Sequence, residues 1–218
     1  MEKQVVVIGL GRFGRSVCKQ LHELGHEVLA IDKKEERVKL ASNYSYYAVV
    51  ANASDESVLK NYGVRNFDHA IIAIGDSIES SILCTLILKD MGVSNVWVKA
   101  RDLHHQKILE KVGADRIIQP EKEMGVRIAN QLDSGKLLDY IELSKDYSIV
   151  ELIATKKLSG KSLIQLDIRA KYGCTILAIK QDETVNVSPM PEDIISKGDV
   201  LVVMGQVNDL KRFEDKGF

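Results

Sequence analysis

Three glycines and one aspartate near the N-terminus have the residue types and the spacing of a site for a phosphate-bearing ligand. Gly9, Gly11 and Gly14 form a Gly-x-Gly-x-x-Gly loop directly after an apolar run, and Asp32 ends the next apolar run. In such a loop the first glycine permits a tight turn, the second lets a phosphate approach the backbone, and the third lets a helix pack closely against the strand. The N-terminus of that helix offers free N–H groups to an anion, and Asp32 can accept hydrogen bonds from a ribose. The pattern predicts a dinucleotide-type nucleotide-binding fold.

Further candidate residues follow the other predicted strands, at the edge of the sheet where ligands bind. Arg12 lies inside the glycine loop, and we favour a contact with a terminal phosphate over an ordinary surface arginine. Asp32 and Lys33 end the second strand, and the Asp32 carboxylate disfavours a cofactor with a 2′-phosphate because like charges repel. The later strands are followed by Asn52, Ala53 and Ser54, which we expect near an adenine ring, then by Ile74 and Gly75, by Lys99, and by Glu121 as a cation ligand that two subunits could share.

The chain up to Pro120 alternates between predicted strands and helices. The strand candidates are short and continuously apolar, as expected for a parallel sheet buried on both faces; they cover residues 5–8, 28–31, 47–50, 70–74, 95–98 and 116–118. Helical patterns cover residues 12–24, 35–42, 56–62, 78–91 and 104–112; several end at a glycine, and Asp55 and Ser77 are candidate N-caps. These elements predict an α/β fold, a doubly wound parallel six-stranded Rossmann sheet in the order 3-2-1-4-5-6.

A further helix is predicted over residues 121–138, with Met124, Ile128 and Leu132, extended by Leu138, at helical spacing. Because the sheet is already complete, this stripe either caps the sheet or forms a crossover or dimerisation helix, and we favour the latter. Beyond it we expect a strand over 148–154, helical turns within 163–172, a hairpin over 175–180 and 184–187, a strand over 199–204 and a helix over 207–213. The predicted domains are a Rossmann domain at 1–120, the dimerisation helix at 121–141 and a small α+β lobe at 142–218.

Composition narrows the class of protein. The 218 residues are 45% hydrophobic and 28% charged, which is ordinary for a globular protein, and the formal net charge of −1 favours neither nucleic acid nor an anionic membrane. No run approaches the ~20 apolar residues of a membrane span, and the N-terminus does not read as a signal peptide. The three cysteines are odd in number and far apart, which indicates a reducing compartment. We expect a cytoplasmic protein that reaches a membrane only through a partner.

The sequence offers no recognisable catalytic constellation. Its five histidines have the spacing of neither a nucleophilic triad nor a zinc site. The C-terminal lobe is also small for the substrate domain of an ordinary dehydrogenase, so we expect no enzymatic activity. The alternatives are an NAD-dependent oxidoreductase on the same fold and an NADH-binding redox sensor that represses transcription; the latter would need a helix-turn-helix and a basic stripe, which the sequence lacks.

Several motifs together resemble the cytosolic RCK (or KTN) regulatory subunits of bacterial Ktr/Trk potassium transporters, in particular the Ktr-type gating subunits of Gram-positive bacteria. The motifs are Gly9–Gly14, Asp32, Ala51–Asp55, Ile74-Gly75, Trp97–Ala100, Gly113–Arg116 and Pro120–Gly125, and residues 142–218 resemble the family's TrkA-C lobe. The resemblance implies homodimers that assemble into an octameric ring under a membrane potassium-translocating subunit. It also implies ATP or ADP, and in some members NAD(H), at the N-terminal lobe, with ATP favouring the conducting state and ADP the closed state.

The resemblance also implies residue roles. The loop with Gly9, Gly11, Phe13 and Gly14 would hold phosphates, Arg12 would contact the terminal phosphates, and Lys99 would line the same pocket. Glu121 matches the family's ligand for a cation, Mg²⁺ or sodium among them.

In Gram-positive relatives the C-terminal lobe resembles a receptor for cyclic di-AMP, which lies across the two-fold axis between paired lobes. The matching stretch here covers residues 163–170. Asp167 and Arg169 would supply hydrogen bonds, and the surrounding residues would be Leu163, Ile164, Ile168, Ala170, Ile176 and Pro191. The alternative, that Leu163, Ile164 and Ile168 are core residues at helical spacing, stays open.

Overall fold

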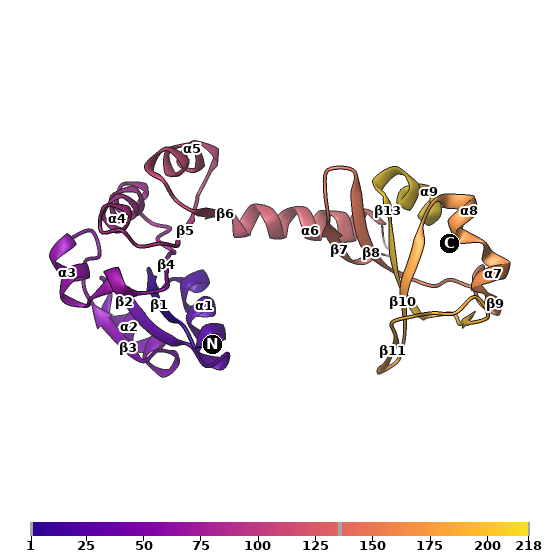
Figure 1. The fold of residues 1–218 in the computed structure, drawn as a ribbon, viewed down its shortest axis with the longest axis horizontal. Helices are drawn as coiled ribbons and strands as arrows, with labels where there is room; N and C mark the ends of the chain where they lie inside the picture. The colour runs from indigo at the N-terminus through magenta and orange to yellow at the C-terminus, as the bar shows by residue number, and fades with distance from the viewer. Residues whose placement is uncertain (1, 135–136, 218) are drawn as a thin grey trace. The chain divides into compact units, whose positions relative to one another are not determined.

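The computed structural model describes residues 2–134 and 137–217. The chain divides into two compact units, Met1–Pro120 and Glu121–Phe218, and each is described by itself (Figure 1). Within the described ranges, none of the helices has both the length and the apolar character that a bilayer span requires.

The first unit is built on a parallel six-stranded sheet. Its strands are β1 (Gln4–Ile8), β2 (Glu27–Asp32), β3 (Tyr47–Val50), β4 (His69–Ile72), β5 (Val96–Lys99) and β6 (Arg116–Ile118), in the spatial order β3-β2-β1-β4-β5-β6. This order confirms the predicted doubly wound sheet. From β1 the chain adds β2 and β3 on one side and β4 to β6 on the other, so the order in which strands are added reverses between β1 and β4. A sheet of this kind opens a crevice for a ligand at the carboxyl ends of those two strands.

Helices pack on both faces of this sheet. They are α1 (Arg12–Glu23), α2 (Glu35–Ala41), α3 (Glu56–Asn61), α4 (Ile78–Asp90) and α5 (Leu103–Val112), with 3₁₀ turns η1 (Ser42–Tyr44) and η2 (Val64–Asn66). Val7 of β1 shares a core cluster with Cys18 of α1. Its neighbour Ile8 shares the other cluster with Leu88 of α4. Because successive side chains of a strand point to opposite faces, both must be apolar, which explains the uninterrupted apolar runs.

Capping side chains and a glycine fix the predicted helix ends. Asp55 Oδ1 accepts a hydrogen bond from the backbone N of Ser57 at 2.9 Å where α3 begins. Ser77 Oγ accepts one from the backbone N of Ser80 at 3.1 Å where α4 begins. Gly113, with a φ of 96°, ends α5 in the left-handed region that favours glycine. Both predicted N-caps are confirmed, and they set where α3 and α4 leave the carboxyl edge of the sheet.

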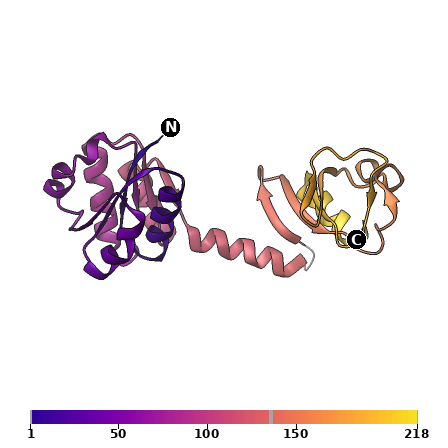
Figure 2. The same ribbon diagram turned by 90° about the horizontal axis from the view of Figure 1, so that it is seen from below.

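The second unit contains helix α6 (Pro120–Ser134), which is one continuous helix in both views (Figures 1 and 2), and a mixed α/β lobe. The lobe has a five-stranded antiparallel sheet in the order β11-β10-β13-β8-β7, made of β7 (Leu137–Glu142), β8 (Tyr147–Ile153), β10 (Thr175–Gln181), β11 (Thr184–Asn186) and β13 (Val200–Gln206). Two short strands, β9 (Lys161–Ser162) and β12 (Ile194–Ile195), pair with each other. Helices α7 (Leu163–Leu166), α8 (Ile168–Tyr172) and α9 (Val207–Gly217) complete it, and the predicted hairpin and final helix are confirmed.

The predicted helix over residues 121–138 is wrong at its C-terminal end. The helix ends at Ser134, and Leu137 and Leu138 belong to strand β7, which the sequence analysis missed together with β9 and β12. Pairing with β8 overrides the helical spacing of Leu138, because it adds an edge strand to the antiparallel sheet. The dipeptide Ser134-Gly135 is a turn signal that should have ended the helix; Gly135 and Lys136 lie outside the described residues.

Candidate functional site

The glycine loop makes a tight turn that only glycine can occupy at two of its three positions. Gly9 has a φ of 92°, and a Cβ there would lie 2.9 Å from the backbone of Ala73 and Ile74. This close approach also marks where β4 ends, at Ile72, two residues before the predicted end. A Cβ on Gly14 would overlap the carbonyl oxygen of Gly9. The first and last glycines are therefore required by packing.

Gly11 differs, because no described atom lies within 4 Å of where its Cβ would be. It is the N-cap of α1, and within the described chain no side chain caps that helix and its first turn carries no acid. The first turn of α1 therefore keeps the N–H groups and the positive dipole end that suit a phosphate, and Gly11 leaves room beside them. Arg12 is exposed beside them and has no ion pair with any residue that the structure describes. Lys99 Nζ lies 5.8 Å from the centre of the Phe13 ring, so a second cation reaches the loop.

Asp32 is held in place by backbone amides at the end of β2. Its side chain is buried, with 5% of the residue exposed. Oδ2 accepts from the backbone N of Leu10 at 2.7 Å, and Oδ1 accepts from the backbone N of Lys34 at 2.9 Å. Arg37 Nη1 donates to Oδ2 at 3.4 Å. The carboxylate is thus oriented by the glycine turn on one side and by the start of α2 on the other.

These residues meet in a crevice at the carboxyl ends of β1 to β4. Of the predicted site residues, Gly9, Asp32, Lys33, Asn52, Ala53, Ser54 and Ile74 line it. Gly11, Arg12, Phe13, Gly14, Gly75 and Lys99 do not line it; all but Gly75 belong to or contact the adjoining glycine loop. Six further lining residues were not predicted as site residues: the apolar Ile8, Ile31 and Ala51, and the polar Arg37, Asp76 and Ser80. Asp76 could have been found because it directly follows Ile74-Gly75, and Ser80 because it lies three residues after the candidate N-cap Ser77.

Glu121 lies in the first turn of α6 and is exposed. It is not among the residues that line the crevice. Among the residues that the structure describes, no group of three or more histidine, cysteine or acidic side chains is arranged to hold a metal ion. A cation on Glu121 would therefore need further ligands from a nucleotide, from water or from a second chain.

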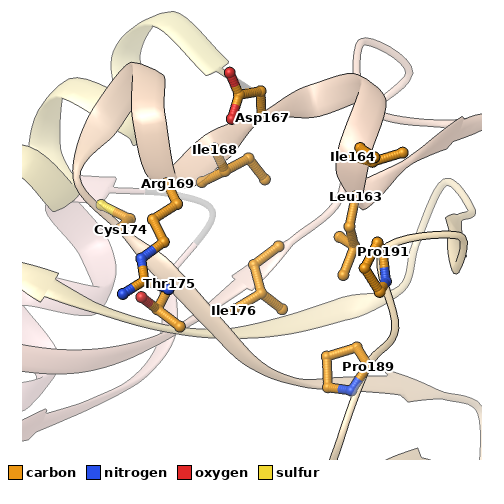
Figure 3. A pocket seen from close by; sticks show the side chains of 10 residues that line it. All are labelled: Leu163, Ile164, Asp167, Ile168, Arg169, Cys174, Thr175, Ile176, Pro189 and Pro191. Carbon is orange, nitrogen blue, oxygen red and sulfur yellow. The ribbon is translucent and has the colours of Figure 1, made fainter.

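The C-terminal lobe contains a cavity of about 320 Å³ between α7, α8 and the start of β10 (Figure 3). Its walls are mainly aliphatic, with Arg169 extending from α8 toward the strand. The lining residues are Leu163, Ile164, Asp167, Ile168, Arg169, Cys174, Thr175, Ile176, Pro189 and Pro191. Of the predicted set only Ala170 does not line it, while Cys174, Thr175 and Pro189 were missed.

Local hydrogen bonds shape this cavity. Ser162 and Gln165 form a reciprocal capping box that starts α7. Asp167 has a φ of 47°, an uncommon conformation for a residue with a side chain, and it turns the chain from α7 into α8. Two hydrogen bonds hold the segment 189–191, which carries both lining prolines. The backbone N of Ile164 donates to the Pro191 carbonyl at 2.9 Å, and Asp193 Oδ2 accepts from the backbone N of Met190 at 2.8 Å.

Cys174 contributes an uncharged wall. Burial, reinforced by the nearby negative charge of Asp209, raises the pKa of its thiol to about 11. The thiol is therefore protonated at neutral pH, and Arg169 and Asp167 remain as the charged groups of the cavity.

Comparison with known proteins decides the family. Residues 5–120 match the TrkA-N domain and residues 147–216 match the TrkA-C domain. The chain is 57% identical to the Ktr system potassium uptake protein A of Bacillus subtilis (strain 168) over 99% of its own length and 97% of the relative's. The chain belongs to the Ktr family of potassium uptake proteins. The resemblance drawn from the motifs is thereby confirmed.

A solved structure shares the fold of the chain. The RCK domain of GsuK matches this Ktr-family chain with a TM-score of 0.67 at 18% identity, over 99% of this chain and 47% of the other. The chain thus spans about half the length of that structure. The RCK C domain of the potassium transport protein KtrA, solved in complex with cyclic di-AMP, is 45% identical and covers 40% of this chain and 96% of its own, with a TM-score of 0.32.

Proposed function

We propose that this chain is the cytoplasmic regulatory subunit of a potassium-uptake system, where it binds nucleotides and gates a membrane-embedded potassium-translocating partner without catalysing a reaction. Family membership supports the potassium-uptake role. The observation that carries the nucleotide role is the crevice beside the glycine turn, where an oriented carboxylate and an uncapped helix N-terminus lie at the strand-order reversal.

ATP and ADP are the proposed ligands of the first unit, and NAD(H) would use the same ribose and phosphate contacts. Asp32 would accept hydrogen bonds from the ribose hydroxyls, and Asn52 to Ser54 would lie along the adenine. The phosphates would extend over Gly11 to the α1 N-terminus. Arg12 is exposed at that terminus, so a third phosphate gives it a partner that ADP lacks.

A bound cation such as Mg²⁺ would neutralise phosphate charge, and Glu121 is the proposed protein ligand. Its position just after β6 puts it at the carboxyl end of that strand, the sheet edge that carries the glycine turn. A single carboxylate suits a cation that takes its remaining oxygen ligands from phosphates or water.

Cyclic di-AMP is the proposed ligand of the C-terminal cavity. The aliphatic walls suit adenine rings, and Arg169 suits a phosphodiester. Ile164 lines the cavity, yet it is 65% exposed, and Met190, between Pro189 and Pro191, is 63% exposed. A second copy of the lobe, related by a two-fold axis, would cover these side chains and close the site around a symmetric ligand.

Dimers that assemble into an octameric ring are the proposed architecture. Met124, Val126, Ile128 and Leu132 of α6 are exposed apolar side chains, as expected of a dimerisation helix. Apolar residues also lie all round α4, with Leu83 and Leu86 exposed on its outer side. A helix that is apolar on every side is normally buried, so α4 is the proposed ring contact.

Gating then needs no chemistry, because a ligand that binds two ring shapes with different affinity shifts their populations by that difference. ATP would favour the shape in which Arg12 reaches its third phosphate, and ADP would favour the other. The partner would be held open or closed by the shape of the ring attached to it.

Calorimetric titration with ATP, ADP, NADH, NAD⁺ and cyclic di-AMP, with and without Mg²⁺, tests the proposal. Asp32→Asn should abolish ATP and ADP binding and leave cyclic di-AMP binding intact. Arg169→Ala should do the reverse, so each variant is the other's control. Cyclic di-AMP should bind at one molecule per two chains. Binding of NADH alone, with turnover of a 2-electron substrate or without it, would support an oxidoreductase or a redox sensor instead.

A further inference from the structure

We propose that Arg37 sets how strongly the first unit discriminates ribose from deoxyribose, by competing with a ribose hydroxyl for Asp32, and that Asp76 receives the displaced guanidinium. This inference rests on the proposed nucleotide binding in the same crevice. It concerns Arg37 and Asp76, two lining residues of the crevice that were not predicted as site residues, and it follows from how many hydrogen bonds the Asp32 carboxylate can accept.

The two oxygens of Asp32 differ in how many hydrogen bonds they already accept. A carboxylate oxygen has two lone pairs. Oδ2 already accepts from the Leu10 backbone N at 2.7 Å and from Arg37 Nη1 at 3.4 Å, so both of its positions are filled. Among the described residues, the Lys34 backbone N alone donates to Oδ1, at 2.9 Å. One ribose hydroxyl therefore finds an open position, and a second must replace Arg37.

Arg37 is the contact that can be replaced. Its distance to Oδ2 is long for a charge-assisted hydrogen bond, which is normally shorter than 3 Å. Its side chain is also 33% exposed, whereas the Leu10 and Lys34 amides are fixed parts of the backbone. Because these two amides already orient Asp32, the carboxylate does not need Arg37 to hold its position.

Asp76 provides the alternative partner. The same Arg37 nitrogen lies 3.6 Å from Asp76 Oδ2, and Lys34 Nζ lies 3.7 Å from that oxygen. Arg37 comes from α2, after β2, and Asp76 comes from the loop after β4, so the pair spans the end of β1 between them. When a hydroxyl takes its place on Asp32, the guanidinium keeps an ion pair with Asp76.

The free space of the crevice supports displacement. With Arg37 and Asp76 among its walls the crevice has a volume of about 40 Å³. Ligand pockets usually measure at least about 300 Å³. An adenosine needs more room than this, and the partly exposed Arg37, which contacts the ribose acceptor, is the side chain that we expect to move.

The test compares ATP with 2′,3′-dideoxy-ATP, which lacks both hydroxyl donors, by calorimetric titration. The measured quantity is the ratio of the two dissociation constants, dideoxy-ATP over ATP. Arg37→Met removes the competitor and should raise this ratio about two- to fivefold by tightening ATP alone, the range expected of a partly exposed ion pair. Asp76→Asn leaves Arg37 with Asp32 as its remaining acid and should lower the ratio by a similar factor.

Two controls make the result specific. Lys39→Met removes the same charge from the same helix, outside the crevice, and should leave the ratio unchanged. The double variant Arg37→Met/Asp76→Asn should match Arg37→Met in this ratio, because the proposed effect of Asp76 on Asp32 passes through Arg37. Arg37→Gln replaces Arg37→Met if the latter lowers the thermal unfolding temperature.

The results distinguish a failure of the Arg37 competition from a failure of nucleotide binding. An unchanged or lowered ratio in Arg37→Met, or a raised ratio in Asp76→Asn, overturns the competition while leaving nucleotide binding intact. Failure of the wild type to bind any ribonucleotide refutes the proposed function, and the competition with it.

Discussion

The two glycines that flank Arg12 and Phe13 should respond in opposite ways to the same substitution, because the space around them differs. In Gly14→Ala the new Cβ overlaps the Gly9 carbonyl oxygen, which is backbone and cannot rotate away. Overpacking of a core usually costs about 1–3 kcal/mol, and this clash should cost at least about 3 kcal/mol. The unfolding temperature of the ligand-free protein should therefore fall by roughly 10 °C.

Gly11→Ala places the methyl group in open space, and the Gly11 φ of −64° suits alanine. Alanine is a poorer N-cap than glycine, which destabilises the folded protein, but it also restricts the unfolded chain, which stabilises the folded protein. Because these effects oppose each other, the free energy of unfolding should change by less than about 1 kcal/mol. The methyl group occupies the place where a phosphate would approach the α1 amides. Losing one charge-assisted hydrogen bond costs about 1.5–3 kcal/mol, so ATP affinity should fall about 10- to 100-fold.

Thermal unfolding and ATP titration of both variants check this pair of predictions. A Gly14→Ala protein as stable as the wild type would show that the turn relaxes and that packing does not demand the third glycine. A Gly11→Ala protein that binds ATP like the wild type would show that phosphates do not pass over Gly11, and the proposed phosphate position at the α1 N-terminus would be wrong.

Three further predictions concern other parts of the chain. Arg12→Ala should equalise the affinities for ATP and ADP while both still bind, which titration of the variant measures; a retained preference would remove Arg12 from phosphate sensing. Asp193→Ala should weaken cyclic di-AMP at least several-fold without changing ATP binding, because Asp193 holds the backbone N of Met190, between the two lining prolines. Burial raises the pKa of the Cys18 and Cys84 thiols to about 12. Because these thiols ionise at lower pH in the unfolded chain, the free energy of unfolding should fall as pH rises from 9 toward 12. Urea titrations of Cys84→Ala should show a slope of unfolding free energy against pH that is flatter by up to about 1.4 kcal/mol per pH unit.

Local signals let the sequence predict most of the first unit. Apolar runs bounded by glycines, and caps such as Asp55 and Ser77, act within a few residues and are visible as patterns. The order of the strands followed from general rules on crossovers. The glycine turn and Asp32 were found for the same reason, since each is tied to one strand end.

Features that depend on distant partners were not visible in the same way. Arg37 meets Asp76, from another strand-end loop, only after the sheet forms. Leu138 fits a helical stripe until β8 pairs with its strand. Pro189 reaches the C-terminal cavity because Asp193 and the backbone N of Ile164 fix its segment. In each case the contact that decides the structure joins residues far apart in the sequence, and a pattern of nearby residues cannot show that they will meet.

The proposed ring explains how a small difference between nucleotides could control a membrane partner. Moving a two-state equilibrium from 1:99 to 99:1 requires about 5.5 kcal/mol of differential affinity. One contact of the Arg12 type, worth a tenfold preference for ATP over ADP, supplies about 1.4 kcal/mol. About four such sites acting together reach the required bias, and an octameric ring has eight. A single exposed arginine per subunit is therefore sufficient for a switch, provided that the ring changes shape as a unit, and the exposed apolar faces of α4 and α6 are the contacts that would couple the copies.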